Sequence, residues 1–363
     1  MRSRQRRPIP THRILGNNEC WIVYGGHLEG VRMFSAIFVW IETGASWIAW
    51  VVLLVAFFVL AKSADAFVES AVGWATWLRV PKLVIGLILV SFATTAPELS
   101  VSVMAARHGN PEMALGNAIG SVICNCGIAL GLCGLLSRNP VPVLRRVFLN
   151  TAFFLLLACL LLLFFVWRDQ VLGRWEGVGL LVVFVAYLGV LFHQYRSGDM
   201  QELVVTERIA LPRSRSLWYL TGAFVLGLGG VILASRFVVL SAVTLATRLG
   251  VPESIIALTL VALGTSVPEV ATSVTAAIKG EGALSVGNIL GANIMNICWV
   301  AGASAIVNPL QISPREMVLM FPALFLIVSS AMVVLYTRES LSRIEGAVLL
   351  GGYGLYMVSF FVV

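Results

Sequence analysis

Two glutamates, Glu98 and Glu269, stand in the middle of long apolar stretches of the chain. An ionised carboxylate at the centre of a membrane helix costs roughly 2.5–3.5 kcal/mol or more, so such residues face a cavity or a partner. Each glutamate follows a proline, which donates no backbone hydrogen bond and crowds the carbonyl four residues earlier. Freed carbonyls at membrane depth are tolerated where they line a wet cavity or bind something. The Pro-Glu pairs therefore predict a cation site rather than protonated glutamates that only pack helices.

Hydroxyl groups accompany both glutamates. Thr94 and Ser102 lie one helical turn on either side of Glu98, and Thr265 and Ser273 are placed in the same way around Glu269. Hydroxyl, carbonyl and carboxylate oxygens are the ligands of Ca²⁺, Mg²⁺ and Na⁺.

Further along the chain from each glutamate, a stripe of mostly polar residues repeats every four positions. The stripes consist of Asn117, Ser121 and Asn125, and of Asn288, Ala292 and Asn296. Glycine pairs of the small-xxx-small type, which let helices approach closely, are interleaved with them at Gly116/Gly120 and Gly287/Gly291. Together with the glutamate stretches, these stripes predict a tight centre of four helices.

The chain contains an internal repeat. With a shift of 171 residues, Val80–Gly131 lies on Val251–Gly302 without a gap, and 20 of the 52 aligned pairs are identical. Shared apolar composition explains matched leucine and valine, but not proline, glutamate, asparagine and glycine in register. We interpret the chain as a duplication.

Hydropathy predicts an all-α integral membrane protein of about ten spans, since about 20 apolar residues cross the hydrocarbon core. The spans expected are 46–68, 83–106, 113–136, 148–167, 175–193, 217–245, 254–278, 284–307, 317–336 and 345–363. Five spans per half is an odd number, so the second half enters the membrane from the opposite side. This predicts two inverted-topology repeats with the ion site at the midplane where they meet.

Four segments follow from these spans. We expect an N-terminal arm at 1–45, a first five-helix repeat at 46–193, a cytoplasmic linker at 194–216 and a second repeat at 217–363. Twelve basic residues fall in loops on one side and five on the other, so both termini are expected outside a cell inner or plasma membrane. The arginine-rich arm disagrees, which suggests the hypothesis that translation starts at Met33.

Composition excludes several classes of protein. The chain is 59% hydrophobic and 12% charged, so lipid must be the solvent for much of its surface. It lacks a basic stripe interleaved with aromatics, so we expect no nucleic-acid partner, and its six cysteines have neither disulfide nor zinc spacing. No catalytic motif lies at membrane depth, so we expect neither an enzyme nor a cofactor.

The two motif blocks resemble the α-repeats of the sodium/calcium exchanger (Ca²⁺:cation antiporter) superfamily. The blocks are Thr94-Thr-Ala-Pro-Glu98 with Gly116-Asn-Ala-Ile-Gly-Ser-Val-Ile-Cys-Asn125, and Gly264-Thr-Ser-Val-Pro-Glu269 with Gly287-Asn-Ile-Leu-Gly-Ala-Asn-Ile-Met-Asn296. The resemblance, to a prokaryotic-type exchanger without a regulatory domain, implies ten helices in two inverted halves. It also implies a set of metal-site residues: Glu98 and Glu269 as shared Ca²⁺ and Na⁺ ligands, Thr94 and Thr265 as oxygen donors, Thr95, Ser266 and Ser121 lining Na⁺ sites, and Asn125 and Asn296 flanking the centre.

Three departures from the family pattern bear on the site. Ala93 replaces a usual glycine, which predicts a stiffer turn in the first half. Ala292 replaces a common Na⁺-liganding serine, and Asn296 replaces an aspartate of the K⁺-dependent branch. Asp65 matches a family aspartate, but an interfacial cap is the role expected from its position.

The function expected is antiport of Ca²⁺ against Na⁺ by alternating access at Glu98 and Glu269. Three alternatives stay open: a proton-coupled or other divalent-cation exchanger, a cation channel, and an intramembrane enzyme. Ca²⁺ and Na⁺, or H⁺, are the substrates expected, the lipid bilayer is the surrounding partner, and the oligomeric state stays undetermined.

Overall fold

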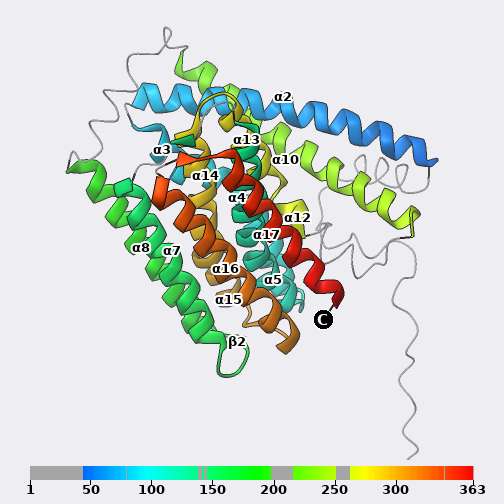
Figure 1. Cartoon of the computed structure of the whole chain (residues 1–363), viewed down its shortest axis with the longest axis vertical. Coiled ribbons are helices and arrows are strands. Elements are labelled where there is room, and N and C mark those ends of the chain that lie inside the picture. Colours follow the sequence, from blue (N-terminus) through cyan, green and yellow to red (C-terminus); the bar gives the residue numbers. More distant parts are fainter. Residues whose placement is uncertain are drawn as a thin grey trace, which may run out of the picture.

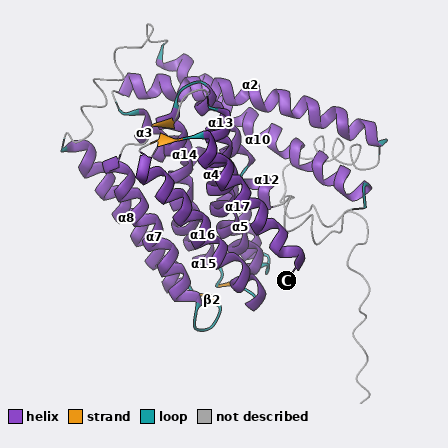
Figure 2. Cartoon of the chain, in the orientation of Figure 1, coloured by secondary structure: helices purple, strands orange, loops and turns teal. Residues whose placement is uncertain are grey.

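The computed structural model describes residues 44–78, 80–137, 141–142, 145–197, 216–250, 262–338 and 340–362. The N-terminal arm with Met33, most of the expected linker and the beginning of the seventh expected span lie outside these residues. The described residues are almost entirely helical, as Figure 2 shows.

The helices of the two halves follow one another in the same order (Figure 1). The first half contains α2 (Ser46–Leu78), α3 (Lys82–Ile85), η2 (Gly86–Val90), α4 (Ser91–Arg107), α5 (Pro111–Cys124), η3 (Asn125–Ala129), α6 (Leu130–Leu136), α7 (Arg145–Val166) and α8 (Arg174–Arg196). The second contains α10 (Leu217–Arg248), α12 (Ala262–Thr265), α13 (Val267–Ile278), α14 (Gly282–Ile294), η6 (Met295–Ala301), α15 (Gly302–Val307), α16 (Pro314–Arg338) and α17 (Arg343–Val362). The segments labelled η are π-helical turns within longer helices.

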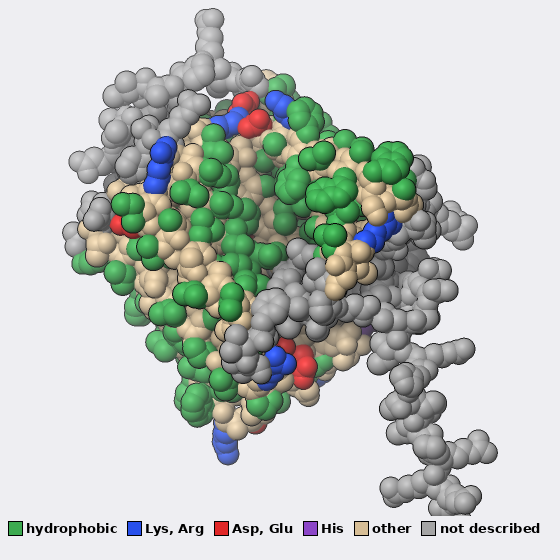
Figure 3. All heavy atoms as spheres, turned by 45° about the vertical axis from the view of Figure 1, so that its right-hand side comes forward, with side chains coloured by type: hydrophobic (Ala, Val, Ile, Leu, Met, Phe, Trp, Pro, Cys, Tyr) green, Lys and Arg blue, Asp and Glu red, His purple; other side chains and the backbone are tan. Residues whose placement is uncertain are grey.

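These helices make the chain a multi-pass membrane protein. Within the described residues, eight helical stretches are long and apolar enough to cross a bilayer, and α13 is a shorter apolar helix. Hydrophobic side chains are spread over the face shown in the space-filling view, and charged side chains there are few (Figure 3). The bounds agree with the predicted spans to within a few residues, except that the first helix continues to Leu78 instead of ending at residue 68.

The long first helix corrects one further expectation. With 33 residues, α2 is about 50 Å long, which exceeds the ~30 Å hydrocarbon core. It slants across the other helices together with α10 (Figure 1). Asp65 therefore lies inside a helix, and its predicted role as a cap is wrong. Its carboxylate lies 3.3 Å from the Lys279 ammonium, at the end of α13.

Two short strand pairs demonstrate the inverted topology. β1 (Val141–Pro142), which precedes α7, pairs with β4 (Ser340–Leu341), which follows α16. β2 (Val171–Leu172), which follows α7, pairs with β3 (Leu310–Gln311), which precedes α16. Since α7 and α16 are equivalent helices of the repeat, the loop before one lies beside the loop after the other. The two halves therefore run through the membrane in opposite directions.

The repeat-related helices α5–α6 and α14–α15 form the centre. Of their most apolar windows, 78% and 83% are buried, against 28% for α2 and 33% for α10. Glycines let α14 touch the first half at its backbone. A Cβ added to Gly287 would lie 2.5 Å from the Leu83 carbonyl oxygen, and one added to Gly291 would overlap the carbonyl oxygen of Leu87. This confirms the close approach predicted for the Gly287/Gly291 pair; the segment that the repeat places opposite Gly116 lies outside the described residues.

Replacing Gly291 by alanine is expected to destabilise the protein by about 1–3 kcal/mol, because a methyl group there overlaps backbone atoms that cannot move aside cheaply. The matched control is Gly189→Ala on α8, where nothing lies within 4 Å of an added Cβ. Thermal unfolding of the purified chain in detergent measures both. An equal melting temperature for Gly291→Ala and Gly189→Ala would contradict the packing described.

Candidate cation site

The two glutamates meet at the centre of the bundle from opposite halves. Glu98 lies on α4 and Glu269 in the first turn of α13, and neither side chain is accessible to solvent. Thr95 of the first half donates a hydrogen bond to Glu269 Oε1 of the second at 3.2 Å. The two Pro-Glu motifs, 171 residues apart, therefore form one site.

The two glutamate helices differ in regularity. α4 passes through Pro97 without interruption, whereas the second helix breaks at Ser266 between α12 and α13. Ala93 lies in the uninterrupted helix, and the stiffer turn expected there stays a prediction. Its counterpart Gly264 packs so closely on α10 that an added Cβ would lie 2.7 Å from Val239 Cγ2. The break places Glu269 at the amino end of a helix, where the backbone dipole favours negative charge.

The amides expected to flank the centre lie on π-helical turns. Asn125 begins η3 and Asn296 lies in η6, while Ser121 lies one turn earlier on α5; all three are buried. α4 packs against η6, and α13 packs against η3. Each glutamate helix therefore contacts the turn that carries the asparagine of the other half. π-Helical turns inside α-helices occur frequently at functional sites.

Unpaired polar atoms are concentrated at this centre. Within the described part of the chain, several buried site atoms take part in no side-chain hydrogen bond: both oxygens of Glu98, Oε2 of Glu269, the hydroxyls of Ser121 and Ser266, and the amides of Asn125 and Asn296. Most buried polar groups in proteins are hydrogen-bonded, so such a cluster needs a physical reason. A cation that these oxygens coordinate would supply it.

The remaining two predicted residues, Thr94 and Thr265, bond to asparagines across the interface between the halves. Thr94 is buried and Thr265 is half-buried. The Thr94 hydroxyl lies 3.4 Å from Asn288 Oδ1, and the Thr265 hydroxyl lies 2.9 Å from Asn117 Oδ1. The sequence places Asn117 and Asn288 in the polar stripes but does not show these contacts.

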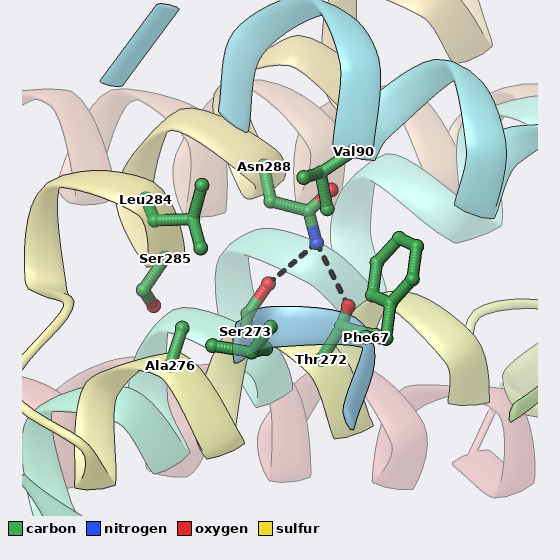
Figure 4. A pocket seen from close by; sticks show the side chains of 9 residues that line it. Phe67, Val90, Thr272, Ser273, Ala276, Leu284, Ser285 and Asn288 are labelled. Atoms are coloured by element: carbon green, nitrogen blue, oxygen red, sulfur yellow. Dashed lines mark hydrogen bonds between the residues drawn. The ribbon is translucent and has the colours of Figure 1, made fainter. Parts of the chain in front are cut away.

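Two further polar residues were not predicted from the sequence. Thr272 accepts a hydrogen bond from Asn288 Nδ2, beside Ser273, which accepts a second (Figure 4). Asn293 is buried and donates through Nδ2 to the sulfur of Cys126 at 3.1 Å. Its position in an apolar stretch between Asn288 and Asn296 is the signal that could have indicated it.

The donor set favours hard cations. Among the residues that the structure describes, no group of three or more His, Cys, Asp or Glu side chains gathers to hold a metal. A cation bound here would meet two carboxylates together with hydroxyl, amide and carbonyl oxygens. Such all-oxygen sets suit Ca²⁺ and Na⁺, whereas Zn²⁺ prefers nitrogen and sulfur.

Several charged side chains outside this centre form ion pairs with one another. Lys279 bonds Glu69 at 2.8 Å and lies 3.3 Å from Asp65, and Lys82 bonds Glu281 at 2.5 Å. Partial burial opposes the charge of Lys279, but its hydrogen bonds with Glu69 and Asp65 raise its pKa above the ordinary lysine value. Both sets of ion pairs join the first half to the second.

Comparison with known proteins gives the family. The sodium/calcium exchanger protein family matches residues 48–193 and 219–362, which is most of the chain. The chain belongs to this family. It is therefore an antiporter of the sodium/calcium exchanger type, a transporter and not an enzyme.

Individual relatives are similar over nearly their whole length. The putative antiporter CaxA of Alkalimonas amylolytica is 35% identical over 309 residues, covering 84% of this chain and 95% of the relative. The sodium/calcium exchanger MaX1 of Methanosarcina acetivorans is 28% identical over 353 residues, covering 86% and 98%. A solved structure of the sodium-calcium exchanger NCX_Mj matches with a TM-score of 0.71 at 25% identity, covering 86% of this chain and 98% of that one.

Neutralising one glutamate is expected to stabilise the cation-free protein at alkaline pH. In chelator, wild-type protein holds two buried carboxyl groups without a counter-cation, whereas Glu98→Gln holds one. Acid removes negative charge from the pair, so the difference should shrink as pH falls and the melting temperature of the variant should depend less on pH.

Melting temperatures in EGTA at pH 5 and pH 9 measure this difference. Glu112→Gln, at an exposed glutamate on α5, is the matched control and should follow wild type. A Glu98→Gln protein that is no more stable than wild type at pH 9 would contradict the account of repelling carboxylates.

Proposed function

We propose that this protein exchanges Ca²⁺ for Na⁺ at a site built on Glu98 and Glu269. The observation that carries the proposal is the meeting of two buried carboxylates from inverted halves, joined by the bond from Thr95 to Glu269. Among the described residues, no donor bonds either oxygen of Glu98 or Oε2 of Glu269. The protein itself leaves this negative charge uncompensated, so a transported cation is the natural counter-charge.

Charge and ligand chemistry favour Ca²⁺ as one substrate. Two carboxylates match the charge of one Ca²⁺, which takes six to eight oxygen ligands. The further oxygens come from residues on the surrounding helices: Thr94, Thr95, Thr265, Ser266, Ser121, Asn125 and Asn296. Na⁺ accepts the same ligand type, so Na⁺ competes for these oxygens and displaces Ca²⁺.

The same charge argument accounts for coupling. A site loaded with Ca²⁺ or Na⁺ is close to neutral, whereas the empty site is an anion inside a low-dielectric bundle. The loaded protein therefore changes its access from one side to the other, and the empty one does not. The inverted halves provide two related arrangements that open to opposite sides, as in other transporters with inverted repeats.

Similar proteins support the choice of ions. The names of MaX1 and NCX_Mj identify both as sodium/calcium exchangers, and each is covered by this chain over nearly its full length. Two positions favour a second candidate, coupling to protons. Ala292 offers no oxygen and Asn296 no charge, so the set of Na⁺ ligands is smaller and proton uptake by the glutamates is the alternative driving reaction.

Uptake of ⁴⁵Ca²⁺ into proteoliposomes tests the exchange. Vesicles preloaded with Na⁺ are expected to take up Ca²⁺ when diluted into Na⁺-free medium, and Glu269→Gln should abolish that uptake because one carboxylate no longer balances Ca²⁺. Glu112→Gln is the control at an exposed glutamate. Near-normal uptake by Glu269→Gln would refute the site, and uptake driven only by a proton gradient would replace Na⁺ by H⁺ as the counter-ion.

We also propose that both termini lie outside a cell inner or plasma membrane, as the distribution of basic loops indicates. The turn before α8 then faces outside and the turn after it faces the cytoplasm. In a cysteine-free background, a membrane-impermeant maleimide added to intact cells should label Asp169→Cys, whereas Ser197→Cys should need permeabilised cells. The reverse pattern would overturn the orientation.

A further inference from the structure

Two hydrogen-bonded relays connect the halves beside the glutamates. In one, Thr265 lies 2.9 Å from Asn117 Oδ1, and Asn117 Nδ2 donates to Ser102 at 3.0 Å. In the other, Thr94 lies 3.4 Å from Asn288 Oδ1, and Asn288 Nδ2 donates to Ser273 at 2.8 Å. Every member of the first relay is 171 residues from its counterpart in the second. The duplication has thus produced the same threonine–asparagine–serine relay twice. In each copy the threonine belongs to one half, and the asparagine and serine belong to the other.

The direction of each bond follows from the groups involved. An asparagine Oδ1 only accepts, so the threonine hydroxyl is the donor in each of these bonds. Thr94 has a second acceptor, the Ser91 carbonyl oxygen, also at 3.4 Å. A hydroxyl that donates its hydrogen in such a bond still has two lone pairs on its oxygen. Those lone pairs are what a cation coordinates, so the asparagine turns the threonine into a pure oxygen ligand.

The orientation of Asn288 is held from its far side. Its Nδ2 donates to Thr272 Oγ1 at 3.1 Å, as well as to Ser273. Thr272 in turn gives its hydrogen to the carbonyl oxygen of Pro268 at 2.8 Å. A flipped amide would lose both donor bonds, and Thr272, whose hydrogen goes to the Pro268 carbonyl oxygen, could not donate to Oδ1 in their place (Figure 4). Asn288 therefore connects Thr94 of one half to the backbone beside Glu269 of the other.

We propose that Asn117 and Asn288 are positioning residues that orient the hydroxyls of Thr265 and Thr94 toward the transported cation. The proposal rests on the proposed function, since it concerns the same site. Partners behind first ligands typically change metal affinity 10–100-fold when they are removed. The asparagines act through the threonines, so losing an asparagine should weaken cation binding without dismantling the bundle.

The test is a set of cation titrations followed by thermal stability, using the purified full chain. The variants are Asn117→Leu, Thr265→Val and their double mutant, with Asn308→Leu as the control. Within the described residues, the Asn308 side chain donates to the Ala106 carbonyl oxygen at 3.0 Å and forms no hydrogen bond with any member of the relays. The titrants are Ca²⁺ in Na⁺-free buffer and Na⁺ in Ca²⁺-free buffer.

Asn117→Leu is expected to raise the half-saturating cation concentration by roughly 10–100-fold while the cation-free melting temperature stays near that of Asn308→Leu. In the Thr265→Val background the same substitution should cause little further loss, because its target hydroxyl is already gone. A cation response that Asn117→Leu leaves unchanged, or two losses that simply multiply, would overturn the relay alone. Wild-type protein that responds to neither cation would contradict the proposed function and the relay together.

Discussion

Two buried carboxylates at the centre of the bundle set the constraints on this molecule. Glu98 and Glu269 are both fully buried, and the described structure provides neither with a basic partner. Leaving such a pair uncompensated is expensive, so the surrounding protein must keep them together against their repulsion. The inverted duplication does this, because each half contributes one Pro-Glu motif at the same depth. A cation that neutralises the pair would then lower the free energy of the folded protein by removing the repulsion between the carboxylates.

The central packing is what keeps the glutamates together. Backbone contacts at Gly287 and Gly291 bring α14 against the first half, so the halves cannot separate without losing close-packed surface. The bond from Thr95 to Glu269 and the two asparagine relays add directional contacts between the halves. By contrast, α2 and α10 are mostly exposed to lipid and slant across this centre (Figure 1). The molecule thus combines a buried centre with a pair of helices that pack closely on each other and leave most of their outer surface exposed.

Much of this could be predicted because duplication leaves a direct trace in the sequence. The 171-residue register identified the paired glutamates, and an odd number of spans per half predicted the inversion that the strand pairs demonstrate. Other features depend on tertiary contacts that no local pattern encodes. The full length of α2 and the partner of Asp65 involve contacts with α13 and α10, which the sequence does not show. The prolines mark both glutamate helices, but the sequence does not show that the helix breaks before Pro268 and continues through Pro97. The bonds of Asn117 and Asn288 join residues about 150 to 190 positions apart, so helical periodicity could indicate their face but not their partners.

The central claim is that one divalent cation binds between Glu98 and Glu269 and that Na⁺ displaces it. Crystals soaked in Sr²⁺, an anomalous scatterer that stands in for Ca²⁺, test it most directly. The account predicts one strong anomalous peak within coordinating distance of both carboxylates, which weakens as Na⁺ is raised and is absent in Glu269→Gln. A wild-type protein whose Sr²⁺ peak lies away from these glutamates, or is unaffected by Na⁺, would contradict it.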